Sequence, residues 1–283
     1  MAKFFCSFLH KQRRGLGPVF RNLNVMRKYY IFFLFLLLSR FSSAQRLHAI
    51  YEYIPSQMAT FKENVYYDGR TKIAVRDSTP QRKQEVNKDN NDEFASSLSV
   101  TIGSGKRFNR IVIHQNNASE QVETRSLQGT NYLVTDKFPA LVWNTDYSDV
   151  DTLGKHVCHK ATATYRGTTL VAYYTHDIPV PVGPSKFGGL PGLIVMLYNE
   201  SASPNYWYLK EVNYPYSGDI PVNDSYIHSL PKLSLEEFIK KEDQSNEEQM
   251  RILYSKIPAI EGVTVDQQKI RGSVEQVYEW EHQ

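Results

Sequence analysis

The residues best suited to chemistry lie together in one short segment, His156-Val157-Cys158-His159. Imidazole nitrogens and thiolates bind zinc, but a structural zinc site needs four ligands and a catalytic site usually takes three from the protein. On a strand, His156 and Cys158 face one way and His159 faces the other, so the segment offers at most two ligands to one site. Nothing in the sequence brings further histidines to this place. We therefore expect no metal and no other cofactor.

Cys158 is also a candidate nucleophile, which would require a lowered thiol pKa and a positioned base. A buried cysteine that packs as a small apolar side chain explains the residue equally well. The sequence has no Gly-x-Ser-x-Gly elbow and no His-Glu-x-x-His motif. Asp146, Asp149 and Asp151 lack the glycine and the distal glutamate of a calcium loop. We expect a protein without enzymatic activity, with a thiol-dependent or hydrolytic enzyme using Cys158 as the alternative.

The amino-terminal segment has the three parts of a secretory signal peptide. Arg27-Lys28 precedes the apolar run Ile31–Leu38, and Ser42-Ser43-Ala44 follows it. The run is about 10 residues long even with the adjoining tyrosines, whereas a membrane-spanning helix needs about 20. We expect translation to start at Met26 and cleavage to follow Ala44. The product would be periplasmic or secreted, with no transmembrane anchor.

Removal of this leader changes the charge of the chain. The whole sequence has 33 Lys and Arg against 30 Asp and Glu, but residues 1–44 hold eight of the basic residues and none of the acidic ones. The remaining 239 residues therefore have 25 basic and 30 acidic side chains, a net charge of −5. Nucleic-acid binding through a basic surface is excluded on this composition. Cys6 leaves with the leader, and residues 45–283 are expected to form a single β-rich domain.

Most of residues 45–283 consists of short segments rich in β-branched and aromatic residues. The predicted strands are Arg46–Ile54, Phe61–Tyr67, Thr71–Val75, Arg110–His114, Gln121–Leu127, Asn131–Thr135, Lys155–Tyr165, Thr168–Thr175, Gly192–Tyr198 and Asn205–Val212. The polar residues from Thr79 to Glu93 are typical of a loop. Ser234 and Glu237 form a capping box that starts a helix, and the charged residues after it leave one helix or two equally open. The order predicts a mainly β protein: a curved antiparallel sheet or half-barrel, bowl-like, with a helix near the carboxyl end.

The segment Asp177–Val195 holds four prolines and four glycines between two predicted strands. Long loops of this kind are uncommon in compact domains and are often functional or ordered by their own packing. Phe187, Leu190 and Leu193 are apolar residues able to attach the loop to the core. Two interpretations remain open: a structural crossover that covers one end of the sheet, and a binding loop.

The same segment resembles the GLPGLI family of exported Bacteroidota proteins. The hexapeptide from Gly189 to Ile194 reads GLPGLI, and the longer stretch Gly183–Ile194 follows the family pattern. The upstream elements also fit: Trp143, then Cys158-His159-Lys160-Ala161, then Tyr173-Tyr174-Thr175. Two departures are Tyr173, where the family usually has tryptophan, and Gly154, which lies one position too far from Cys158. The match is strong from about Trp143 to Leu197.

This resemblance implies a periplasmic or secreted cell-envelope protein of a largely uncharacterised family. It implies an association with TonB-dependent outer-membrane receptors or peptidase systems. The domain is also similar to the bowl-like amino-terminal module of a flavobacterial peptide-N-glycosidase, which implies a curved β fold and an accessory role but transfers no catalytic residue.

We therefore expect a binding module whose concave sheet face and Asp177–Val195 loop contact a peptide, a glycoprotein or an envelope partner. A purely structural envelope protein is a further alternative. The candidate binding residues are Trp143, Tyr173, Lys186, Phe187, Gly189, Leu190, Pro191 and Gly192.

Overall fold

The computed structural model describes residues 46–55, 59–79, 82–83, 109–115, 119–222, 224–256, 271 and 273–282. These residues belong to one compact unit, Gln45–Gln283. The leader predicted for residues 1–44 lies outside the described residues. So does most of the polar stretch predicted as a loop between residues 79 and 93.

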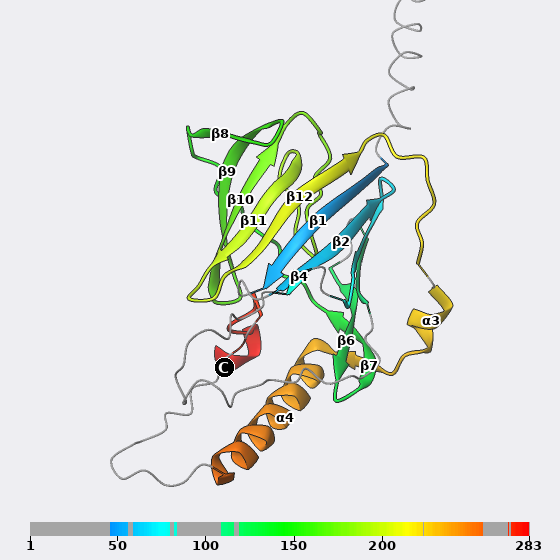
Figure 1. The fold of residues 1–283 in the computed structure, drawn as a ribbon, viewed down its shortest axis with the longest axis vertical. Helices are drawn as coiled ribbons and strands as arrows, with labels where there is room; N and C mark the ends of the chain where they lie inside the picture. Colours follow the sequence, from blue (N-terminus) through cyan, green and yellow to red (C-terminus); the bar gives the residue numbers. More distant parts are fainter. Residues whose placement is uncertain are drawn as a thin grey trace, which may run out of the picture. The chain divides into compact units, whose positions relative to one another are not determined.

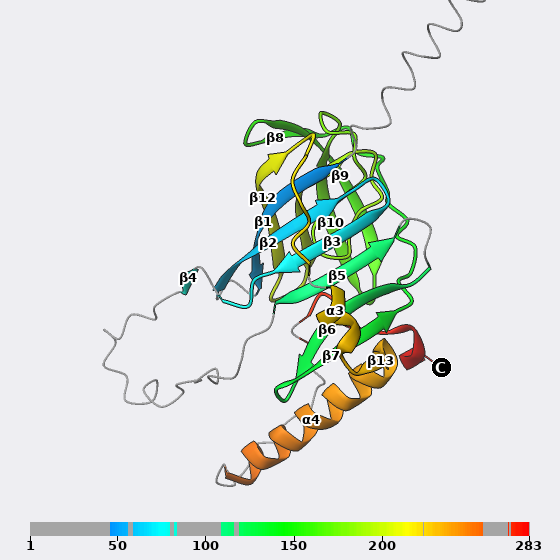
Figure 2. The same ribbon diagram turned by 90° about the vertical axis from the view of Figure 1, so that its right-hand side faces the viewer.

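Twelve strands form one mixed, open sheet (Figures 1 and 2). In sheet order they are β13 (Lys232–Ser234), β7 (Thr130–Asp136), β6 (Gln121–Leu127), β5 (Arg110–Gln115), β3 (Thr71–Arg76), β2 (Ala59–Tyr67), β1 (Leu47–Pro55), β12 (Asn205–Asn213), β11 (Leu193–Glu200), β10 (Thr168–Thr175), β9 (His156–Tyr165) and β8 (Val150–Leu153). β4 (Arg82–Lys83) adds to β2 beside this path. All of these ladders are antiparallel except β13 with β7. The predicted fold class, mainly β with a curved sheet and a helix near the carboxyl end, is confirmed.

Short hairpins connect neighbouring strands where the sequence has turn residues. The β6–β7 turn places Gln128 and Gly129 at φ 49° and 80°, and the β9–β10 turn places Arg166 and Gly167 at φ 41° and 78°. Positive φ at both central residues is the type I′ geometry, whose twist matches that of paired strands. The glycine adopts it without steric cost. Each turn thus fixes the register of its hairpin, and the β9–β10 turn also fixes the direction of the Arg166 side chain.

The carboxyl-terminal part contains α3 (Asp224–Ser229), α4 (Leu235–Lys256) and the short 3₁₀ helix η3 (Glu279–His282). The capping box is present: the Glu237 amide donates to Ser234 Oγ at 3.2 Å, and the Ser234 amide donates to Glu237 Oε2 at 2.8 Å. One continuous helix follows, which settles the choice between one helix and two. Within the described residues, no helix combines the length and the apolar character that crossing a membrane requires.

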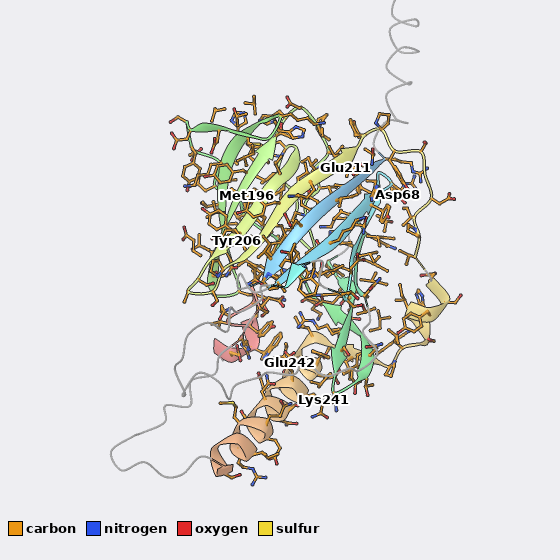
Figure 3. All side chains as sticks on the ribbon, in the orientation of Figure 1. Asp68, Met196, Tyr206, Glu211, Lys241 and Glu242 are labelled. Atoms are coloured by element: carbon orange, nitrogen blue, oxygen red, sulfur yellow. The ribbon has the colours of Figure 1, made fainter. Side chains whose placement is uncertain are left out.

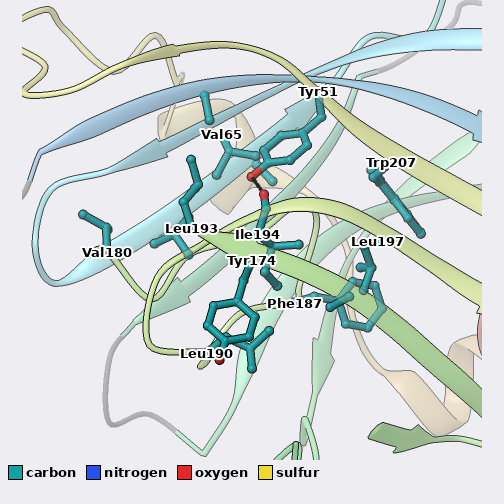
Figure 4. Close-up of a cluster of buried hydrophobic side chains, with 14 of the residues drawn as sticks. Tyr51, Val65, Tyr174, Val180, Phe187, Leu190, Leu193, Ile194, Leu197 and Trp207 are labelled. Atoms are coloured by element: carbon teal, nitrogen blue, oxygen red, sulfur yellow. Dashed lines mark hydrogen bonds between the residues drawn. The ribbon is translucent and has the colours of Figure 1, made fainter. Parts of the chain in front are cut away.

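Two faces of the sheet differ in what covers them. The inner face, as we call it, carries the main apolar core, which includes Tyr51, Tyr174, Leu197 and Trp207 (Figure 4). The chain between β10 and β11, residues 176–192, lies against this face and contributes Val180, Phe187 and Leu190 to the same core. We call residues 176–192 the inner loop. A second, smaller core forms where Leu235, Phe238 and Ile239 of α4 pack on Val134 and Tyr278.

Candidate functional site

The inner loop holds most of the predicted binding residues, and the structure buries several of them. Lys186, Phe187 and Leu190 have only 5 %, 2 % and 1 % of their surfaces exposed. Gly192 is also buried, whereas Gly189 and Pro191 are exposed. Trp143 is half-buried against the loop, and its Nε1 donates to the Gly188 carbonyl at 2.9 Å. The last predicted residue, Tyr173, is half-buried on β10, paired with Lys160 and Met196.

The backbone of the inner loop is tied to itself and to the start of β11. Val182 and Gly188 form an isolated bridge. The Leu193 amide donates to the Ile178 carbonyl, and the Ile194 amide donates to the Val182 carbonyl, both at 3.0 Å. Tyr51 on β1 adds a hydrogen bond from its hydroxyl to the Ile194 carbonyl at 2.6 Å (Figure 4). These bonds satisfy backbone groups that burial would otherwise leave unpaired.

Gly192 shows why a glycine is needed in the hexapeptide. A Cβ placed on Gly192 would lie 2.0 Å from the Thr175 carbonyl oxygen, far inside van der Waals contact. That oxygen belongs to the backbone of β10 and cannot move aside without disturbing the strand. The close approach of two backbones therefore excludes any side chain at Gly192.

Lys186 ends in a buried cluster of carboxylates. Its Nζ lies 3.0 Å from Glu275 Oε1, 3.2 Å from Asp136 Oδ2 and 3.5 Å from Glu123 Oε1. These partners come from β6, β7 and the carboxyl-terminal segment. All three carboxylate side chains are at most 4 % exposed. One lysine of the inner loop thus joins three segments that are distant in the sequence.

Three arginines complete this cluster. Arg166 pairs with Asp136 at 2.6 Å and with Glu275 at 2.5 Å, and Arg125 pairs with Glu123 and Glu275, each at 2.7 Å. Arg110 pairs with Glu123. We call Lys186, these three arginines and their three acidic partners the buried charge cluster.

The charges of this cluster change the protonation of its acids. Burial alone would raise the pKa of Glu275. The positive charges of Lys186, Arg125 and Arg166 outweigh that effect and hold the pKa well below its usual range. Glu275 therefore remains ionised in the interior.

A second set of charges holds the residues on either side of Lys186. The Ser185 amide donates to Glu63 Oε1 at 2.6 Å, and Lys72 Nζ donates to the Phe187 carbonyl at 2.6 Å. Burial is the main cause that lowers the pKa of Lys72 to about 7, while Glu63 acts in the opposite direction. The inner loop is thus fixed at three consecutive residues by buried polar groups of β2, β3 and the buried charge cluster.

This packing places the inner loop against the sheet face that was expected to contact a ligand, and that expectation itself stays a prediction. The chain's own loop occupies that face, because its apolar residues complete the core and its lysine neutralises buried carboxylates. The Lys186 ammonium group and the Phe187 ring both make their contacts inside the chain.

Cys158 lies in the interior of the β8–β9 hairpin. Its side chain has no exposed surface, and Sγ donates weakly to the His156 carbonyl at 3.5 Å. Burial raises the pKa of the Cys158 thiol to about 11, which opposes thiolate formation. His156, on the same face, is also buried, and His159 contacts the ring of His176 instead. Among the described residues, no group of three ligand-type side chains is arranged to hold a metal ion.

The opposite face of β10, β11 and β12 presents tyrosines to solvent. The rings of Tyr198 and Tyr206 are 5.4 Å apart, and those of Tyr206 and Tyr208 are 5.9 Å apart and nearly parallel. Tyr173 lies on the same face, next to Met196. We call Tyr173, Tyr198, Tyr206 and Tyr208 the tyrosine face. Figure 3 labels Met196 of β11 and Tyr206 of β12, which are neighbouring strands of this face.

A cavity of about 640 Å³ adjoins this face where β11 and β12 separate. The ladder between them covers only Tyr206–Tyr208 of β12, and β12 then continues to Asn213 with β1 as its one partner in the described chain. The cavity is lined by Leu209–Val212 of β12, by Val195 and Met196 of β11, and by the β8–β9 turn. An unpaired strand edge therefore borders a partly apolar hollow.

A family model described as "Protein of unknown function (Porph_ging)" matches residues 48–196. The chain belongs to the Porph_ging family. The matched residues run from β1 into β11 and include the inner loop. No curated protein matches the chain.

Two solved structures of PNGF-II, in C2 and P21 space groups, are similar to this Porph_ging protein. Both are 11 % identical, with TM-scores of 0.44 and 0.45. The similarity covers 70 % of this chain but only 32 % and 33 % of the PNGF-II chains. The chain therefore spans about a third of their length.

Two features of the structure, the buried charge cluster and the open end of the β11–β12 ladder, could not be predicted from local sequence patterns. Arg110, Glu123 and Arg125 alternate with other residues on strands, a pattern that is typical of a solvated face. Glu275 lies in a tail whose structure the sequence left ambiguous. The end of the β11–β12 ladder depends on how the strands twist apart, which no local pattern encodes.

Proposed function

We propose that this Porph_ging protein is an exported, non-enzymatic binding module of the cell envelope. The leader-like segment at residues 27–44 supports export, to the periplasm or beyond. The buried Cys158, with its raised thiol pKa, offers no activated nucleophile and so gives no support to a thiol enzyme.

The proposed binding surface is the tyrosine face together with the adjoining cavity. One observation carries the proposal: within the described chain, residues Leu209–Val212 of β12 have an edge without a strand partner, and they line a cavity of about 640 Å³. Strand edges with unpaired backbone groups bind extended peptides by adding a strand. Tyrosines offer broad apolar area with polar tips at low cost in conformational entropy.

The proposed ligand is accordingly an extended peptide segment of another envelope protein. Association with an outer-membrane receptor or a peptidase system, which the resemblance to the GLPGLI family implies, fits such a ligand. The inner loop has a structural part in this proposal: it completes the core on which the strands of the binding face rest.

The test uses the full chain and fluorescent decapeptides in which valine or threonine alternates with polar residues. We expect saturable binding that slows hydrogen exchange of the amides in Leu209–Asn213. Methylating alternate backbone nitrogens of the peptide removes its donors and should abolish binding.

The matched variants are Tyr206→Ser with Tyr208→Ser, which should weaken binding, and Val142→Ser as the control. Val142 is 84 % exposed but lies outside the tyrosine face. Binding that survives N-methylation, or that favours glycans over every peptide, would refute the proposed ligand.

A further inference from the structure

A second cavity, of about 290 Å³, lies at the other end of the sheet between β5, β6, β7 and the helices α3 and α4. It borders the buried charge cluster, since Arg110 and Arg125 form part of its wall. Phe238 supplies an apolar wall, and Glu242 and Asn131 line the remaining sides. The cavity is large enough for one small organic molecule.

Each of the two guanidinium groups on this wall has N–H donors that its carboxylate partners do not use. Arg110 uses Nε and Nη2 on Glu123, and Arg125 uses Nε on Glu123 and Nη2 on Glu275. In the described part of the chain, the Nη1 group of Arg110 has no hydrogen-bond partner, and the Arg125 guanidinium is also hydrogen-bonded to the Tyr278 side chain. Their buried carboxylate partners hold the guanidinium groups in place, so these donors are oriented before any ligand arrives.

Two acceptors of the cavity, on Glu242 and Asn131, are unpaired within the described residues. The positive charges of Arg125 and Arg110 act to lower the pKa of Glu242. No arginine nitrogen in the described chain forms an ion pair with its carboxylate. Burial is the main cause that raises the pKa of Glu242. Asn131 donates through Nδ2 to the Tyr226 hydroxyl at 3.0 Å, but its buried Oδ1 has no partner in the described structure. Unpaired buried polar atoms are rare and require an explanation.

From these groups we infer that the cavity binds a free α-amino acid. Its carboxylate accepts hydrogen bonds from Arg110 and Arg125, and its ammonium group donates to Glu242 and Asn131. Guanidinium groups are the usual partners of carboxylates in proteins, and such charge-assisted bonds are the strong ones. A zwitterion satisfies both sets of unpaired atoms at once, whereas a simple carboxylate satisfies only the arginine side.

The experiment is calorimetric titration of the full chain with each common L-amino acid, with acetate and methylamine as single-charge probes. We expect at least one amino acid to saturate the protein and both single-charge probes to bind far more weakly. Glu242→Gln should weaken amino-acid binding by about tenfold or more and leave acetate binding unchanged. Glu248→Gln, which changes an exposed glutamate of the same helix paired with Arg251, should change neither.

The arginine side is tested without substitution, because Arg110 and Arg125 belong to the buried charge cluster. The bound amino acid should shift the side-chain NMR signals of both arginines, and acetate should shift them weakly. The inference is overturned if no amino acid binds below about 10 mM. It is also overturned if Glu242→Gln binds the amino acid as tightly as the unaltered chain, or if the arginine signals do not move.

Discussion

Replacing Lys186 by methionine tests the structural role of the inner loop directly. Methionine keeps much of the length and apolar volume of the lysine stem but removes the charge that lies within 3.5 Å of Glu123, Asp136 and Glu275. Breaking a buried ion pair by removing one partner costs about 3–5 kcal/mol, since the remaining charge stays buried and less compensated. For a domain of this size, we expect the melting temperature to fall by roughly 6–20 °C.

The assay is chemical unfolding, with Lys240→Met as the matched control. Lys240 pairs with Glu236 at 2.7 Å on the exposed surface of α4, and exposed pairs contribute little. We expect the control to unfold like the unaltered chain.

The pH dependence of the Lys186→Met variant should also change. The depressed pKa of Glu275 adds stability above its ordinary pKa of 4.5, and this stability is lost as pH falls through the folded value. Without Lys186 the folded pKa moves up, so acid unfolding should begin at a higher pH.

Adding Glu275→Gln to Lys186→Met removes one of the three carboxylates that have lost their contact with Lys186. The double variant should therefore lose less stability than the two single losses added together.

Two results would refute this reasoning. A loss below about 1 kcal/mol would mean that the remaining arginines suffice to compensate the carboxylates. Loss of peptide binding with unchanged stability would make Lys186 a contact residue instead of a structural one.

Three further predictions concern single groups. Lys72→Met should flatten the rise in stability between about pH 7 and pH 10 in a pH series of unfolding curves. Lys72 has a folded pKa of about 7 against an ordinary 10.5, so the unfolded chain holds a proton that the folded chain releases; an unchanged slope would contradict the lowered pKa. Gly192→Ala should prevent folding or lower the melting temperature severely, because the new Cβ would lie 2.0 Å from the Thr175 carbonyl oxygen; circular dichroism of a variant with native stability would disprove the close approach. Cys158 should react with iodoacetamide at pH 7 at least about a hundredfold more slowly in the folded chain than in denaturant, because it is buried and its pKa is about 11; fast alkylation would restore the thiol enzyme as a candidate.

The placement of the inner loop explains why a proline- and glycine-rich segment lies in the core. Irregular backbone in an interior leaves polar groups that must be satisfied. Here the bridge between Val182 and Gly188 and the bonds from the start of β11 satisfy many of them. Lys72 and Glu63 bond the backbone on either side of Lys186. An ordinary loop would stay at the surface, where water performs this task.

Local patterns were enough to predict much of the fold. The ten predicted strands are all present, because alternating and β-branched residues specify extended chain next to a core. The turns at Gln128-Gly129 and Arg166-Gly167 and the capping box at Ser234 follow from short-range chemistry within a few residues. The strands β4, β8 and β13 were missed, since they are only two, four and three residues long and depend on their neighbours for pairing, and β4 lies in the stretch predicted as a loop.

What the sequence by itself determined was the mainly β class, the helix near the carboxyl end and the hexapeptide with its apolar anchors. Only the tertiary structure decided what those residues contact. Arg110, Glu123, Asp136, Arg166, Lys186 and Glu275 span more than half of the chain, and each, taken alone, has the character of a surface residue. Their compensation depends on distances between segments that local patterns do not encode. Folding places four cations and three carboxylates in one interior, and mutual neutralisation there makes a lysine of the proline- and glycine-rich segment part of the core.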